Sequence, residues 1–262
     1  MPTTYTHDLF GKAVFQKLPE EMQEIVKKHR MAYIIGLHGP DILFYYHPFQ
    51  KNEMNQTGNR MHEEMASDFF RHCKRRYLVT GNEAVLAYTM GFICHYMLDS
   101  SCHPYIYRYT ERTGASHAEI ETELDRVFME KNGKNPFTYH PGSVIHIDND
   151  AVEAIADVLG KFSDKQIRTT LRFMKFYTGI TVCRTSLKRK VLLKFLRLAG
   201  IYEETHGRVI RKQHFTRCAE STRELISMVK CTVPETVTVL EEFYQTLDDP
   251  DVINYRFSRN YN

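Results

Sequence analysis

Apolar positions along most of the chain recur at helical spacing, and no stretch shows the sustained alternation that marks a strand. Proline and two acids at positions 19–21 are typical of a first helical turn. Loops are expected at 36–58, 101–114 and 132–148, where Gly, Pro, Asn and His collect. The pattern predicts an all-α protein, with further helices over residues 62–78, 82–100, 116–131, 148–160, 164–178, 186–200, 217–230 and 234–247.

Length and composition favour a globular protein with a packed core. The chain has 262 residues, of which 42% are hydrophobic and 12% aromatic. We expect a single multi-helix bundle domain over residues 1–262, with its chemistry mainly in 1–125 and a helical remainder over 148–247. Nothing in the sequence indicates the oligomeric state.

Charge and targeting signals narrow the class of protein. The net charge is only +3, so no nucleic acid is expected as a stable partner. The first residues show no basic region followed by an apolar stretch, which predicts no signal peptide and a cytoplasmic location. Six widely spaced cysteines indicate reduced thiols. The longest uncharged run, 84–98, has 15 residues and predicts a buried helix.

Histidines concentrate in the first part of the chain, where nine of the 13 lie within residues 1–117. His95 and Asp99 are four residues apart at the end of the apolar helix, so their side chains project from one face. A buried carboxylate needs a partner. A hydrogen bond between the two residues would satisfy it, and so would a divalent cation.

More potential ligands follow at the same spacing. His103, which precedes Pro104, comes four residues after Asp99, and His117 and Glu121 lie four apart at the start of a new helix. Imidazole nitrogen and carboxylate oxygen together suit zinc best among the common metals. These additions favour a metal site over a local hydrogen bond.

The chain resembles the zinc-dependent phospholipase C family. That family includes secreted bacterial phospholipases C and the catalytic domain of clostridial alpha-toxin, and fungal single-strand nucleases share its zinc fold. The resemblance covers about residues 5–125 and implies a helical bundle of the phospholipase C type. It rests on five ordered elements: His7, Gly39-Pro40-Asp41, His62, His95-x-x-x-Asp99-x-x-x-His103-Pro104 and His117-x-x-x-Glu121.

The resemblance implies two zinc ions, with Asp41 bridging or flanking them. The implied ligand sets are His62, His95 and Asp99 for one ion, and His103, His117 and Glu121 for the other. A third ion would use His7 and share Asp99. In the secreted relatives a processed N-terminal residue completes that site, whereas this chain begins Met1-Pro2. His47 is an alternative to His62, while His38 and His72 are expected not to be ligands.

The implied activity is phosphodiester hydrolysis. Zinc polarises phosphoryl oxygens and activates a water for in-line attack, and Asp41 is the candidate catalytic residue that orients this water or takes its proton. We expect a phospholipase C-like enzyme acting on phospholipid head groups. The alternatives are a nuclease or small-phosphodiester hydrolase at the same metal site, and a noncatalytic metal- or lipid-binding protein.

Residues 186–200 contain five basic and seven large apolar side chains and no acid. This composition is typical of a helix that lies on an anionic membrane surface, and it predicts peripheral membrane contact. The alternative is a helix packed into the protein through its Leu face, with Lys and Arg in solvent. A basic loop over 206–214 has no metal-ligand spacing, and a phosphate contact there stays open.

Overall fold

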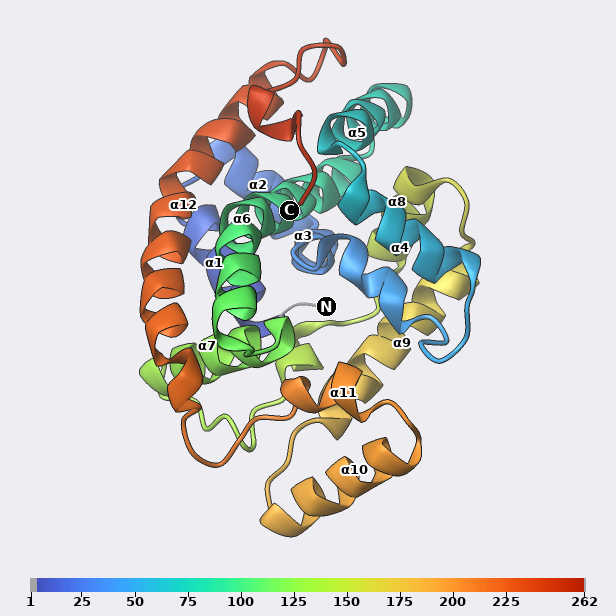
Figure 1. Ribbon diagram of the computed structural model, residues 1–262. Helices are drawn as coiled ribbons and strands as arrows, with labels where there is room; N and C mark the ends of the chain where they lie inside the picture. Colours follow the sequence, from blue (N-terminus) through green and yellow to red (C-terminus); the bar gives the residue numbers. More distant parts are fainter. Residues whose placement is uncertain (1–3, 262) are drawn as a thin grey trace.

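The computed structural model describes residues 4–261, and within that range the chain forms helices and no strand (Figure 1). The predicted all-α class is confirmed. Its α-helices are α1 (Thr4–Phe15), α2 (Glu20–Lys28), α3 (Arg30–Gly36), α4 (Glu53–Glu63), α5 (Ala66–Thr80), α6 (Glu83–Thr113), α7 (His117–Lys131), α8 (Asn149–Leu159), α9 (Asp164–Ile180), α10 (Ser186–Leu198), α11 (Tyr202–Thr205) and α12 (Ala219–Gln245). Short 3₁₀ segments are η1 (Gly39–Tyr45), η2 (Pro141–Val144), η3 (His206–Arg208), η4 (Thr216–Cys218) and η5 (Tyr255–Phe257).

Helix α6 is the central element, and α1, α3, α5, α8 and α12 pack around it (Figure 1). Every residue from 84 to 100 is buried. Because this segment is apolar on all its faces, it is stable only when other helices surround it. His95 and Asp99 are therefore carried into the interior. Within residues 4–261, every helix is too short or too polar to cross a bilayer.

Helix α3 crosses α6 at unusually close range. A β-carbon at Gly36 would lie 2.3 Å from the backbone oxygen of Tyr88, and one at Gly91 would lie 2.2 Å from the backbone oxygen of Tyr33. Glycine at both positions lets the two backbones touch. The chain then enters η1 directly, which places the Gly-Pro-Asp segment beside the ligand-bearing part of α6.

The predicted loop at 101–114 was wrong, because α6 continues through it to Thr113. Proline inside a helix deprives the carbonyl four residues earlier of its N–H partner. Here Pro104 leaves the Ser100 carbonyl free, and the Arg259 side chain donates to that oxygen at 3.0 Å. A contact with the distant C-terminal segment thus allows the helix to pass its proline.

Other predicted boundaries also changed in the structure. The helix expected over 62–78 is α5, which begins at Ala66, and an unpredicted helix, α4, occupies part of the predicted loop at 36–58. The helices expected over 217–230 and 234–247 form one, α12, which contains Pro234 and packs along α1, α6 and α7. Helices α1, α3 and α11 were not predicted from the sequence. At these helix boundaries, tertiary packing outweighed the preferences of the local sequence.

Helix α10 lies at the edge of the molecule, away from the main core (Figure 1). Leu196 is its single buried residue. With Cys183 and Val209, Leu196 forms a small separate apolar cluster. Leu192 and Leu193 of the same helix are partly buried and pack against this cluster.

Candidate metal centre

Asp99 on α6 contacts three imidazoles. Its Oδ1 lies 3.2 Å from His7 Nε2, and its Oδ2 lies 3.2 Å from His95 Nε2 and 3.6 Å from His103 Nε2. His95, Asp99 and His103 come from one face of α6 because they are spaced four residues apart. His7 reaches the same carboxylate from α1.

Asp41 in η1 joins a second pair of histidines to the cluster. Its Oδ1 lies 3.2 Å from His62 Nε2, and its Oδ2 lies 3.7 Å from His95 Nε2. The other ring nitrogen of His62 lies 2.7 Å from the Gly58 carbonyl oxygen. A bond of this kind fixes the orientation of an imidazole, so Nε2 points to the centre.

Glu121 supports the far end of the cluster from α7. Its Oε1 lies 2.9 Å from His117 Nε2 and 3.8 Å from His103 Nε2. Ser116 and Glu119 form a capping box at the start of α7. This cap fixes the first helical turn and with it the direction of His117.

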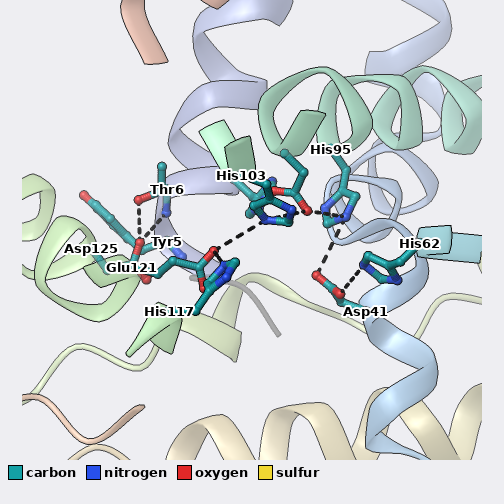
Figure 2. A network of polar contacts seen from close by, with 11 residues as sticks. Tyr5, Thr6, Asp41, His62, His95, His103, His117, Glu121 and Asp125 are labelled. Atoms are coloured by element: carbon teal, nitrogen blue, oxygen red, sulfur yellow. Dashed lines mark hydrogen bonds and ion pairs between the residues drawn. The ribbon is translucent and has the colours of Figure 1, made fainter. Parts of the chain in front are cut away.

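The structure brings all eight residues predicted for the site into one cluster (Figure 2). The donor atoms of seven of them form two groups, within each of which all atoms lie within 4.8 Å of one another, and His7 belongs to neither group. The groups match the two implied ligand sets, with Asp41 added to the first. They are Asp41, His62, His95 and Asp99, and His103, His117 and Glu121.

Helix α1 holds His7 through a cap supplied by another helix. The Asp125 carboxylate on α7 accepts hydrogen bonds from the N–H of Tyr5 at 3.2 Å and from the N–H of Thr6 at 2.7 Å, and it also accepts the Thr6 hydroxyl (Figure 2). These N–H groups lie in the first turn of α1 and have no partner within their own helix. Asp125 therefore fixes the turn that carries His7.

An open cleft of about 470 Å³ leads to the cluster. Six of the eight clustered residues line it, and only His7 and His95 lie behind them. A substrate in the cleft can therefore reach the carboxylates and imidazoles directly. Arg208 of η3 is the basic side chain that lines this cleft.

A family model described as zinc-dependent phospholipase C matches residues 6–172, which include all eight clustered side chains. The chain belongs to this family. The resemblance inferred from the motifs is thereby confirmed. Comparison with curated proteins and comparison with solved structures gave no match. Membership in the zinc-dependent phospholipase C family supports a metal-dependent, phospholipase-like enzyme.

The donor atoms fit the zinc that the family name implies. Asp41 Oδ2, His95 Nε2 and Glu121 Oε2 are buried and have no hydrogen-bond partner among residues 4–261. Unpartnered buried polar atoms are rare and unfavourable. Imidazole nitrogens and carboxylate oxygens are normal zinc ligands, and a cation between these groups would satisfy them.

The carboxyl groups of the centre are held in their ionised form. Burial raises the pKa of Asp99, but the charge of His103 and of the two other neighbouring imidazoles holds it well below its ordinary value. The pKa values of Asp41 and Glu121 are likewise lowered by adjacent imidazoles despite burial. The site therefore presents negative charge to a cation at neutral pH.

The pKa values of the imidazoles shift in the opposite direction, upward. Burial lowers the pKa of His103, but Asp99 and Glu121 more than offset this and raise it to about 9. The pKa values of His7 and His62 are also raised, against the effect of burial, by Asp99 and Asp41 respectively. At neutral pH a proton on His103 thus competes with a metal for this imidazole.

Three histidines outside the predicted set lie in different places. His47 is exposed and contacts the rings of Tyr46 and Phe173, away from the two donor groups. His72 bonds the Val158 carbonyl. His38 is buried, and its pKa is lowered to about 3 by burial and by the charges of His7 and His95. A neutral His38 therefore lines the centre, next in sequence to the Gly-Pro-Asp segment.

Sequence patterns carry no signal for Tyr261 and leave open which residue of the basic loop over 206–214 could contact phosphate. The buried Tyr261 ring lies 4.9 Å from the His62 ring and 5.9 Å from the His95 ring, measured between centroids. Within the basic loop, Arg211 pairs with Glu119, which leaves Arg208 as the loop residue that lines the cleft. Both contacts depend on chain segments distant in sequence.

Proposed function

We propose that the protein hydrolyses the phosphodiester bond of phospholipids on the diacylglycerol side, releasing diacylglycerol and a phosphorylated head group. The observation that carries this proposal is the cluster of eight donor side chains at the base of an open cleft, within the part of the chain that matches the family. A catalytic phosphodiesterase needs both features, because the substrate phosphorus has to reach the metals.

Zinc bound here would polarise the phosphoryl oxygens and lower the pKa of water for attack at phosphorus. The four-residue group around Asp99 would hold one ion, and the group around Glu121 would hold a second. His7 with Asp99 would contribute to a third site. Met1 and Pro2, which bear on that third site, lie outside the described residues.

Asp41 is the proposed catalytic residue. It lines the cleft, and its Oδ2 has no hydrogen-bond partner among the described residues. Neighbouring imidazoles keep its pKa low despite burial, so it is a carboxylate at neutral pH. A carboxylate in this state accepts a hydrogen bond from the attacking water and orients it toward phosphorus.

Arg208 is the proposed contact for the substrate phosphate. Its half-buried side chain lines the cleft, and its Nε has no hydrogen-bond partner among residues 4–261. A guanidinium presents paired N–H donors that match the oxygens of a phosphate. Arg208 can therefore hold a nonbridging oxygen while the reaction proceeds at the metals.

The outer face of α10 supports a peripheral location at an anionic membrane. Leu187, Val191, Phe195 and Leu198 share one face of the helix and are 72%, 60%, 62% and 79% exposed. Leu196, on the opposite face, packs against the protein together with the partly buried Leu192 and Leu193. Residues 186–200 therefore combine the two alternatives considered from the sequence, the membrane-surface helix and the packed helix. One apolar face of α10 packs against the protein, and a second apolar face is exposed.

Exposed basic residues flank this outer apolar face, among them Lys188, Lys190 and Lys194. Apolar side chains bordered by lysines are the arrangement that binds the boundary between lipid head groups and acyl chains. We infer that α10 places the protein on the membrane that contains its substrate.

The test is zinc-dependent hydrolysis by purified protein with three substrates: phosphatidylcholine, a small chromogenic phosphodiester and single-stranded DNA. We expect phosphatidylcholine hydrolysis that a chelator abolishes and zinc restores. Asp41→Asn should lose most of the activity, since the carboxylate that orients water is gone. Asp68→Asn is the matched control, because its carboxylate is 79% exposed and belongs to α5.

Each of the other outcomes is informative. Activity that survives both chelation and Asp41→Asn would eliminate the metal mechanism. Cleavage of DNA without cleavage of lipid would assign the same site to a nuclease. Stoichiometric zinc with no hydrolysis of any substrate would identify a noncatalytic metal-binding protein.

A further inference from the structure

A second pocket, of about 450 Å³, lies beside the metal cleft and is largely apolar. Its size falls within the roughly 300–1,000 Å³ typical of small-molecule sites. It is formed where η1, α9 and α10 meet. Its apolar lining includes Tyr45, Phe49, Ile180, Leu192, Leu196 and Val209.

This pocket opens toward the metal cleft, because the two share lining residues. Phe44, Glu204 and Arg208 belong to both. One molecule can therefore occupy both spaces at once, with a polar part in the cleft and an apolar part in the pocket.

Arg208 lies at the junction of the two spaces. Its unpartnered Nε can donate to an anion at this junction, where the acidic Glu204 also lies, and the wall beyond these two residues is mainly apolar. A molecule that joins a phosphate to a hydrocarbon chain has the polarity that this arrangement requires. A compact diester without a chain would leave the pocket empty.

The pocket also lies next to the proposed membrane contact. The inner face of α10 contributes Leu192 and Leu196 to its wall, while the outer face of the same helix is the exposed apolar stripe. Much of the wall comes from residues after 172, beyond the segment that matches the family model. A lipid drawn from the surface beneath α10 thus meets the pocket and the cleft together.

We propose that this pocket, the acyl pocket, binds an acyl chain of the phospholipid whose phosphate lies in the metal cleft. The inference rests on the proposed function and deepens it by assigning the part of the substrate that the metals do not touch. It predicts selectivity for diesters that carry a hydrocarbon chain over those that do not, even when both are monomeric in solution.

The kinetic test compares Ile180→Trp with Val79→Trp. Ile180 lines the acyl pocket, and an indole there fills it, whereas Val79 on α5 is 76% exposed and lines neither space. The substrates are monomeric dihexanoyl phosphatidylcholine and bis(p-nitrophenyl) phosphate. We expect Ile180→Trp to lower kcat/KM at least about tenfold for the lipid, since several methylene groups lose their burial. Activity on the chromogenic diester should be unchanged.

The chromogenic substrate also shows that the variant is folded and loaded with metal. An equal loss on both substrates, or no loss on either, would overturn the acyl pocket. Val79→Trp should match the wild type on both.

A binding measurement separates this inference from the proposed reaction. Calorimetric titration with monomeric dodecyl phosphate, a monoester that the reaction does not cleave, should show binding to the wild type and to Val79→Trp, with a marked loss in Ile180→Trp. Inorganic phosphate should bind all three proteins alike. Binding of dodecyl phosphate by a protein that hydrolyses no diester would sink the proposed function and leave the acyl pocket standing. Diester hydrolysis combined with equal dodecyl phosphate affinity in all three proteins would support the proposed function and overturn the acyl pocket.

Discussion

Gly39 lies directly against the imidazole of His95. A β-carbon at position 39 would fall 2.2 Å from His95 Cδ2, and the φ angle of Gly39 is +47°. Both the contact and the left-handed backbone require glycine. The chain therefore passes over the His95 ring at this point and brings Asp41, two residues later, within 3.7 Å of His95 Nε2. The Gly-Pro-Asp motif is explained by this crossing.

Gly39→Ala should displace His95 and weaken zinc binding by at least about tenfold, because a metal ligand has to move away from the added methyl group. Gly81→Ala is the matched control. Gly81 also has a positive φ, of 61°, but a β-carbon there meets nothing within 4 Å. Each variant should lose about 1–2 kcal/mol of stability from backbone strain. Zinc competition titrations and thermal melts measure the two effects, and equal zinc affinity in the two variants would refute the role given to Gly39.

Asp125→Ala should lower both stability and zinc content. It leaves the first-turn N–H groups of Tyr5 and Thr6 buried without an acceptor, which costs about 1–2 kcal/mol in unfolding free energy. His7 follows this turn and should lose its fixed position. Asp148→Ala is the matched control. Asp148 caps α8 by accepting a hydrogen bond from the Ala151 N–H, and it is far in sequence from the residues of the metal centre.

Elemental analysis and thermal melts of the two variants test this prediction. Both should melt at lower temperature than the wild type, and only Asp125→Ala should hold less zinc. Equal zinc content in both would show that Asp125 serves stability alone.

Zinc binding should release protons at pH 7. Carboxylates raise the pKa of His103 to about 9, against the effect of burial, so this imidazole is protonated in the metal-free protein at neutral pH, and they also raise the pKa values of His7 and His62. Zinc takes only neutral imidazole. Apparent zinc affinity should therefore rise as pH increases from 6 toward about 9.

Calorimetry in two buffers of different ionisation enthalpy measures the protons released. His72→Gln should leave the number unchanged, because His72 bonds the Val158 carbonyl and not the cluster. A binding enthalpy that is the same in both buffers would contradict the protonated state assigned to the metal-free site.

Replacing Lys188, Lys190 and Lys194 by Gln should reduce binding to anionic vesicles about a hundredfold, since each lysine near such a surface contributes about 1 kcal/mol. All three are exposed on α10, and Lys188 Nζ also donates to the Val182 carbonyl at 2.6 Å. Arg189 is kept, because its Nε donates to the Ile210 carbonyl and supports the fold. Co-sedimentation with vesicles measures the effect.

The control for this variant removes three exposed lysines elsewhere, Lys17, Lys51 and Lys165, and so changes net charge equally. A Phe195→Gln variant tests the apolar part and should weaken binding to anionic and neutral vesicles alike. Unchanged vesicle binding by the α10 lysine variant would end the membrane proposal.

Local spacing made much of the centre predictable. The four-residue step from His95 to Asp99 lies within a predicted helix, whereas the step to His103 is helical only because α6 continues through the predicted loop at 101–114. The contacts of Asp41 with His95 and of His7 with Asp99 join separate elements, and only the family resemblance indicated them.

Other features depended on tertiary structure alone. Helix α1 begins with residues of low helix propensity and relies on Asp125 from α7, so the local sequence does not predict this helix. The seven large apolar residues of α10 do not reveal which of them pack inward. The structure shows that Leu196 does so while Phe195, its neighbour, is exposed.

The packing of Tyr261 against His62 and His95 has a consequence for biosynthesis. The ribosome makes Tyr261 after every one of the eight donor residues, so the nascent chain can gather its imidazoles before their aromatic cover exists. The aromatic wall beside His62 and His95 is thus among the last parts of the centre to be synthesised.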